Sequence, residues 1–238
     1  MAENLRTTKT MVGNHTIPPG ATIPDDNPLT DLEWLERGPV MVEDTYPSWS
    51  EDPWDYGWGT WALYGVDSAG DLSDDAISHL ERCGLLYNWW TTDDEPNYQH
   101  RLCPSGWRVP STADWSELFE YVGPNAGGKL KSTSPDCWDS PNTGATDEFG
   151  FHACGCGYRS GAPSRSPWSN DGGFFHDRMY GWWLSSDIDV HYAFWTDNMT
   201  TWSGMYQNDH ARMFYNDDQA HSDHDWPATG MSVRCIKN

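Results

Sequence analysis

Four of the six cysteines are placed where they could hold a soft metal or form disulfides. Cys154 and Cys156 are separated by one glycine, so in a strand both thiols would project from the same face. With His152 nearby, this arrangement suits copper or zinc, because these metals prefer thiolate and imidazole ligands. Disulfides from this pair to Cys83 and Cys137 explain the same four cysteines. We favour disulfides and expect no metal site.

A second arrangement that could chelate zinc is the pair His221 and His224, whose His-x-x-His spacing suits that metal. The chain has nine histidines and many carboxylates, so such clusters are easy to imagine. No third ligand has helical or hairpin spacing relative to this pair. We therefore interpret the segment as a solvated loop.

The charge of the chain limits its partners. It has 36 Asp and Glu against 14 Lys and Arg, which gives a formal net charge of −22. Such a field repels phosphates and anionic membranes, so we expect no nucleic-acid partner. The acids are scattered rather than spaced as a Ca²⁺-binding loop, so we interpret them as a solvated surface. We expect no cofactor, with bound Ca²⁺ as the alternative.

The cysteines and the missing targeting signals bear on location. An even set of six cysteines, with many turns and few lysines, predicts disulfides formed outside the cytosol. No stretch approaches the roughly 18 apolar residues of a membrane span, so we expect no membrane insertion. The N-terminus also lacks a charged region followed by an apolar one. We expect an extracellular, cell-surface or virion protein, whose export signal is missing from this chain or whose export follows another route, such as assembly into a virion.

Two helices are expected to position these groups. Residues 72–90 predict a first helix that turns Ile77, Leu80, Leu85 and Leu86 inward and is divided by Gly84.

The clearest helix spans residues 112–122. Ser111 is a good N-cap and Asp114 completes a pattern like a capping box. Gly123 and Pro124 then end the helix. The inward face of this helix carries Trp115, Leu118, Phe119 and Val122.

After residue 128 the pattern changes to short runs separated by turn residues. Such a pattern predicts a meandering antiparallel sheet with long loops, closed by a strand at residues 231–236. We predict one domain over residues 1–238, with an extended and loop region (1–71), a helical core region (72–160) and a loop-rich region (161–238). Because the chain has 16 Trp but only 37% hydrophobic residues, rings must supply much of the core. We expect Trp182, Trp183, Phe194 and Trp202 to be buried.

The strongest functional hint is the segment 187–226, where rings and polar side chains alternate between short apolar anchors. Rigid amphipathic rings with adaptable polar neighbours are typical of recognition surfaces. We predict that this segment binds a ligand, with His221 and His224 beside the main candidates. These candidates are Tyr192, Trp195, Asn198, Trp202, Tyr206, Asn208, His210, Tyr215, Asn216 and Asp218.

Six phrases of the chain resemble the Fibrobacter succinogenes major paralogous domain, which occurs in many secreted bacterial proteins. They are MAENLRTTK at 1–9, LYNW at 86–89, CPSGWRVPS at 103–111, GKLKST at 128–133, GYR at 157–159 and SVRC at 232–235. The resemblance covers nearly the whole chain. It implies an α+β fold related to C-type lectins and formylglycine-generating enzymes, with two helices, a small twisted antiparallel sheet and long loops over one side.

The resemblance also implies that Cys103 and Cys235 form a disulfide. Members of the family usually carry a strand or two before the AENL phrase, so we expect an edge strand that is missing here or supplied by a neighbouring chain. Residues 95–97 (EPN) match a Ca²⁺-ligating tripeptide of mannose-type C-type lectins, and residues 195–198 (WTDN) are reminiscent of its partner motif. About a hundred residues separate the two motifs, which argues against that site.

We therefore predict a binding or adhesion module that presents residues 187–226 to a cell-surface protein or glycan. No Gly-x-Ser-x-Gly motif, phosphate-cradling loop or dinucleotide fingerprint is present, so we expect no enzyme. One alternative is a structural fibre or tail-fibre subunit that assembles with copies of itself. The other is an oxygenase of the formylglycine-generating type, which would need a reduced cysteine pair.

Overall fold

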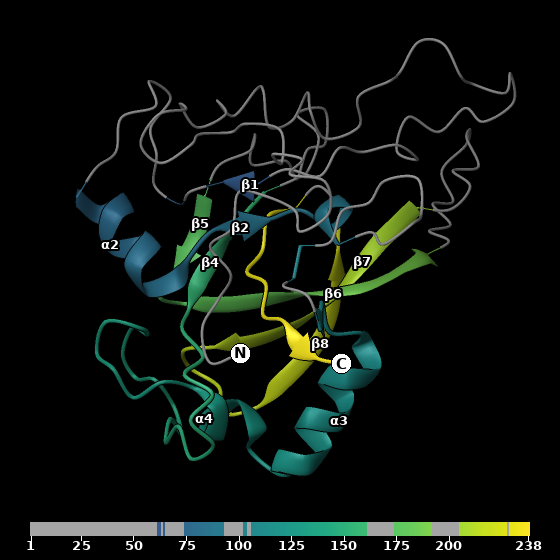
Figure 1. The fold of residues 1–238 in the computed structure, drawn as a ribbon. Helices are drawn as coiled ribbons and strands as arrows, with labels where there is room; N and C mark the ends of the chain where they lie inside the picture. Colours follow the sequence, from purple (N-terminus) through teal and green to yellow (C-terminus); the bar gives the residue numbers. More distant parts are fainter. Residues whose placement is uncertain are drawn as a thin grey trace, which may run out of the picture.

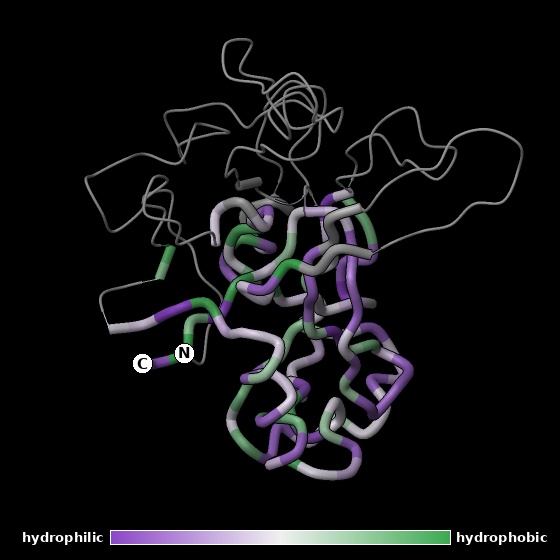
Figure 2. The backbone as a smooth tube through the Cα atoms, turned by 90° about the vertical axis from the view of Figure 1, so that its right-hand side faces the viewer, coloured by the Kyte–Doolittle hydropathy of each residue, from purple (hydrophilic) through white to green (hydrophobic). Residues whose placement is uncertain are grey.

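The computed structural model describes residues 61–62, 64, 74–92, 102–103, 106–160, 174–191, 205–227 and 229–238. Our expectations for residues 1–60, and for the burial of Phe194 and Trp202, lie outside this part of the chain. No helix within it is long and apolar enough to cross a membrane. Figure 2 accordingly shows hydrophobic and hydrophilic residues interspersed along the described backbone. The division into one domain with three regions stays a prediction.

The first helix, α2 (Asp74–Cys83), ends where glycine permits a turn. Gly84 has φ of 76°, a conformation that residues with a side chain seldom adopt, and its N–H donates to the Leu80 carbonyl at 2.9 Å. The chain then forms a short strand, β2 (Leu86–Tyr87), and a 3₁₀ turn, η1 (Trp89–Thr91). Leu85 and Leu86 are buried as predicted. The predicted second helical piece is therefore wrong, because the buried run after Gly84 pairs with other strands.

The main helix, α3 (Thr112–Val122), has the predicted bounds and caps. The Ser111 hydroxyl accepts from the Asp114 N–H at 3.2 Å, and the Asp114 carboxylate accepts from the Ser111 N–H at 2.7 Å. Gly123, with φ of 75°, ends the helix. Trp115 and Val122 are buried, and Leu118 and Phe119 pack beside them. A short helix, α4 (Ala126–Leu130), follows directly.

The main sheet has five strands in the order β5-β4-β6-β7-β8. These strands are β4 (Cys156–Arg159), β5 (Phe174–Asp177), β6 (Tyr180–His191), β7 (Met205–Phe214) and β8 (Ala220–Asp225). The sheet departs from the predicted antiparallel meander between β4 and β6, which are parallel where Gly157 pairs with Gly181. Strand β5 runs antiparallel to β4, and the chain then turns back on the other side of β4, so β6 runs in the same direction as β4.

Two smaller sheets join distant parts of the chain. One pairs β1 (Trp61–Ala62) with β2, and the other pairs β3 (Trp107–Arg108) with β9 (Ile236–Lys237). The predicted closing strand is therefore present in part. Residues Met231 and Ser232 before it form single bridges to Tyr87 and Trp183.

The core has two parts, which lie on opposite faces of the five-stranded sheet. In Figure 1, α3 and α4 lie on one side of this sheet, and β1 and β2 lie on the other. One part of the core contains Trp182, Leu184, Tyr87 and Val233, and the other contains Trp183, Ala211 and Met213 with α3 and α4. The neighbours Trp182 and Trp183 face opposite ways because side chains alternate along a strand. Both are buried, as predicted. The described part of the chain is thus a mixed α+β structure with rings at the centre of each half.

All six cysteines form disulfides. The structure joins Cys103 to Cys235, the pair that the resemblance implies. It joins Cys83 to Cys156 and Cys137 to Cys154, so the Cys-Gly-Cys segment serves two separate bridges. In this state neither Cys154 nor Cys156 has a free thiol that could bind a metal.

Candidate functional site

The predicted ligand-binding segment is built around the hairpin of β6 and β7. The two strands pair from Tyr180 opposite Phe214 to His191 opposite Met205, with a register shift between Leu184 and Ile188. Residues 192–204, which connect them, lie outside the described residues, as do both parts of the lectin-like calcium motif at 95–97 and 195–198. The predicted ligand contacts Tyr192, Trp195, Asn198 and Trp202 are among these residues.

The remaining predicted residues do not share one surface. Tyr206 lies on β7 opposite Val190, near the start of the strand. Tyr215, Asn216 and Asp218 lie in the turn after β7, about 30 Å further along at 3.4 Å per residue. A single small ligand cannot touch both ends of this strand.

Asn208 and His210, in the middle of β7, are buried at 0% and 2% exposure. The Asn208 amide, in the orientation its surroundings require, donates to the carbonyls of Asp225 (2.9 Å) and Trp226 (3.0 Å) and so holds the end of β8. The prediction that Asn208 contacts a ligand is therefore corrected. Asn208 has a structural role, because its amide is buried and both of its N–H donors are engaged within the chain.

His210 belongs to a group of rings that crosses the sheet. Trp182 stacks on Tyr158 on one side, with ring centroids 4.1 Å apart, and on His210 on the other, at 4.8 Å. Tyr158 in turn lies 5.7 Å from Phe175. We call Phe175, Tyr158, Trp182 and His210 the inner ring row. They come from β5, β4, β6 and β7, respectively.

A second row runs beside the first, with one residue from each of β5, β6, β7 and β8. His176 and Tyr180 have centroids 4.2 Å apart, Tyr180 meets Phe214 at 4.9 Å, and Phe214 meets His221 at 5.3 Å. All four residues are partly exposed, whereas Trp182 and His210 of the inner row are buried. We call His176, Tyr180, Phe214 and His221 the outer ring row.

Burial shifts the pKa values of three of these rings toward their neutral forms. It lowers the pKa of His210 to about 4 and also lowers the pKa of His176. Burial raises the pKa of Tyr158 to about 12, with a smaller contribution from the Asp225 carboxylate. Rings of this kind offer flat contact surfaces together with hydrogen-bonding atoms.

Charges lie at the rim of the outer row. Asp223 pairs with Arg212, whose guanidinium lies 4.9 Å from the Phe214 ring centroid, and the Asp217 carboxylate accepts a hydrogen bond from His221 Nε2 at 2.7 Å. The predicted loop at 221–226 is wrong, since most of it is strand β8. His221 and His224 are three residues apart in this strand, so they project from opposite faces and cannot chelate one ion.

The cationic residues of the recognised phrases build the framework rather than a ligand surface. Arg108 pairs with Asp114 at 2.7 Å, which holds the pKa of that carboxyl well below its usual range. Lys131 is fully buried, and its ammonium donates to the carbonyls of Phe214 (2.9 Å) and Asp217 (2.7 Å). Arg234 donates to the carbonyls of Phe151 and His152 and stacks 4.3 Å over the Phe151 ring. These phrases therefore specify the core and its turns.

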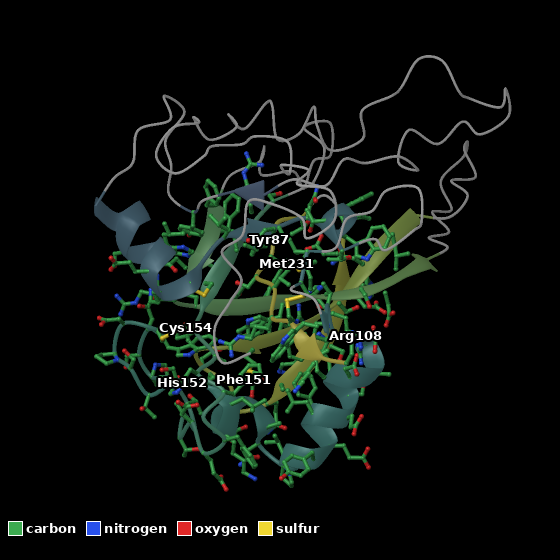
Figure 3. All side chains as sticks on the ribbon, viewed as in Figure 1. Tyr87, Arg108, Phe151, His152, Cys154 and Met231 are labelled. Atoms are coloured by element: carbon green, nitrogen blue, oxygen red, sulfur yellow. A yellow bond between two sulfur atoms is a disulfide. The ribbon has the colours of Figure 1, made fainter. Side chains whose placement is uncertain are left out.

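Figure 3 shows Tyr87 beside Met231, its bridge partner, and Phe151, His152 and Cys154 on one stretch of chain. A model of the Fibrobacter succinogenes major domain matches residues 1–237. The chain belongs to this family. Comparison with curated proteins and with solved structures found no match. Within the described part of the chain, most residues of the phrases that suggested this family are buried, and the ring rows lie mostly outside these phrases.

Sequence reasoning missed most of the ring rows. Tyr158, Phe175, His176 and Tyr180 precede the segment that composition singled out. They reach His210, Phe214 and His221 only because β4 lies between β5 and β6. The alternation Tyr180-x-Trp182 is a visible signal that this strand carries large rings on one face.

Proposed function

We propose that this chain is an extracellular or virion-surface binding module with a C-type-lectin-like fold. It recognises a protein or glycan through the β6–β7 hairpin and the outer ring row beside it. The observation that carries the proposal is the outer row itself, four partly exposed rings from β5, β6, β7 and β8 on a framework built by the family phrases. A rigid sheet that presents rings suits recognition, because little side-chain entropy is lost on binding.

Several features support this proposal over catalysis. Burial shifts the pKa values of His210, His176 and Tyr158 toward their neutral forms, and every cysteine is engaged in a disulfide, whereas an oxygenase of the formylglycine-generating type needs a reduced pair. Three disulfides are typical of proteins that work in an oxidising environment outside the cytosol. The Cys103–Cys235 bridge and the β3–β9 pair, which join the entry of α3 to the chain end, support the C-type-lectin-like fold.

The proposal is tested by screening the oxidised chain on glycan arrays and on arrays of cell-surface proteins. The screen is repeated with Trp195→Ala and Tyr206→Ala, which alter the predicted ligand-facing segment. We expect a specific signal that both variants weaken while their folding, checked by circular dichroism, is unchanged. A folded chain that binds nothing on either array contradicts the proposal.

A further inference from the structure

A cluster of metal-ligating side chains lies where α2 meets β4 and β5. His79 Nε2, Cys83 Sγ and a carboxylate oxygen of Asp177 are all within 4.8 Å of one another. Cys156 adds a second sulfur, since it is bonded to Cys83. His79, Cys83 and Cys156 are buried, so water is largely excluded from the cluster. Two sulfurs, one imidazole and one carboxylate are therefore gathered where α2 meets β4 and β5.

Regular secondary structure brings the four residues together. His79 and Cys83 are four residues apart on α2, so their side chains lie on one face of the helix. Cys156 and Asp177 are directly opposite each other in the antiparallel pair β4–β5. One helical pair and one cross-strand pair thus face each other, and no loop has to move to assemble the set.

The surroundings of the cluster hold its members in place. Arg82 donates to both oxygens of Asp177, at 2.8 and 2.9 Å, and the Tyr64 ring stacks on His79 with centroids 4.4 Å apart. His79 Nε2 lies 3.1 Å from the Cys156 carbonyl and 3.4 Å from Asp177. Its Nδ1 is buried and has no hydrogen-bond partner among the residues the structure describes. Oriented ligands of this kind resemble the supporting contacts around protein metal sites.

We propose that the thiol form of this chain, before Cys83 and Cys156 pair, binds one Zn²⁺ through these two thiolates, His79 and Asp177. Four ligands of this chemistry match the tetrahedral coordination that Zn²⁺ adopts in closed sites. Binding releases the two thiol protons, and neutral imidazole is an ordinary ligand of zinc. The Arg82 guanidinium offsets the net negative charge of two thiolates and a carboxylate around one Zn²⁺. Formation of the Cys83–Cys156 bridge removes two ligands, so the disulfide and the metal exclude each other.

The test uses the full chain reduced with a phosphine, so that no thiol other than the chain's own is present, under anaerobic conditions. Co²⁺ serves as a spectroscopic probe, because thiolate ligands give it a charge-transfer absorption, and Zn²⁺ is then added as competitor. We expect one equivalent of Co²⁺ to bind with this absorption and to be displaced by Zn²⁺, and we expect the oxidised chain to show no such absorption. His79→Ala and Asp177→Asn should each weaken binding by at least about tenfold.

The matched control is the double variant Cys137→Ser with Cys154→Ser, which removes another disulfide pair. It should keep the cobalt absorption, whereas Cys83→Ser with Cys156→Ser should lose it. Equal loss in both double variants, or no effect of His79→Ala, overturns the proposal. If circular dichroism shows that the reduced chain unfolds without metal, Zn²⁺ is expected to restore the fold. Failure to restore it, or a folded reduced chain that binds no metal, also overturns the proposal.

Discussion

Tyr158 on β4 and Trp182 on β6 stack with ring centroids 4.1 Å apart and planes only 4° apart. Their strands are parallel neighbours that share a single register pair, Gly157 with Gly181. The stack therefore supplements a short backbone ladder at the centre of the sheet. It also connects the core phrase GYR to the hairpin that we propose for binding.

The Cys103–Cys235 bridge closes a loop of 132 residues and ties the entry of α3 to the last strand. Replacing both residues with serine should lower the free energy of unfolding by about 2–5 kcal/mol, because a loop of this length leaves much freedom to the unfolded chain. The free energy is measured by urea unfolding at equilibrium. The single variants carry an unpaired thiol, so the double variant is the proper comparison. A stability within 1 kcal/mol (roughly the error of the extrapolation) of the unmodified chain would contradict this assignment.

Lys131→Met should destabilise the fold by about 1–3 kcal/mol, since it leaves two buried carbonyls, of Phe214 and Asp217, without their charged donor. Methionine keeps most of the volume, so the loss reports on the hydrogen bonds rather than on packing. Lys129→Met is the matched control, because the Lys129 ammonium makes one bond, to the Val122 carbonyl, and its residue is only half-buried. Thermal unfolding followed by circular dichroism compares the two. Equal losses in both variants would argue against a structural role of Lys131.

Stability should fall as the pH drops from about 6.5 toward 4. His79 and His210 each have a pKa lowered to about 4 by burial, whereas in the unfolded chain both titrate near the ordinary value of 6.5. Within that window the unfolded state binds more protons, so acid favours unfolding, by up to about 3 kcal/mol for each histidine. The stability is fully present above pH 6.5 and is lost progressively below it.

His210→Phe should flatten this pH dependence, which urea unfolding measured at several pH values will show. Trp182→Phe is the control, since it changes the stacked partner but keeps the imidazole, and it should retain the slope. A slope that survives the loss of His210 unchanged would mean that its imidazole is not held neutral by the fold.

The main helix could be predicted from the sequence because its signals are local. Ser111, Asp114 and Gly123 mark the ends of α3 within a few residues. The sheet order could not, because the position of β4 between β5 and β6 depends on contacts far apart in the chain. The register pair between the parallel strands β4 and β6 joins two glycines, Gly157 and Gly181, so no hydrophobic periodicity in the sequence indicates this pairing.

The candidate site was predictable only in part for the same reason. Composition singled out the segment that contains the β6–β7 hairpin, but it could not separate residues that face the core, such as Asn208, from those at the rim, such as Phe214. Both lie on the same face of β7, and they differ only in how far the rest of the chain covers them. His221 and His224 illustrate the opposite error, in which a spacing that suits chelation in a loop is divided between two faces of a strand.

The most direct measurement of the central claim is the affinity of ring variants for whatever partner the array screens identify. Tyr180→Ala and Phe214→Ala remove neighbouring rings of the outer row, and Tyr121→Ala removes a ring that is 77% exposed on α3. We predict that each outer-row variant raises the Kd by about tenfold or more, as truncation of an interface ring commonly does, while Tyr121→Ala leaves it unchanged. Folded Tyr180→Ala and Phe214→Ala chains that bind as tightly as the unmodified chain would contradict the account.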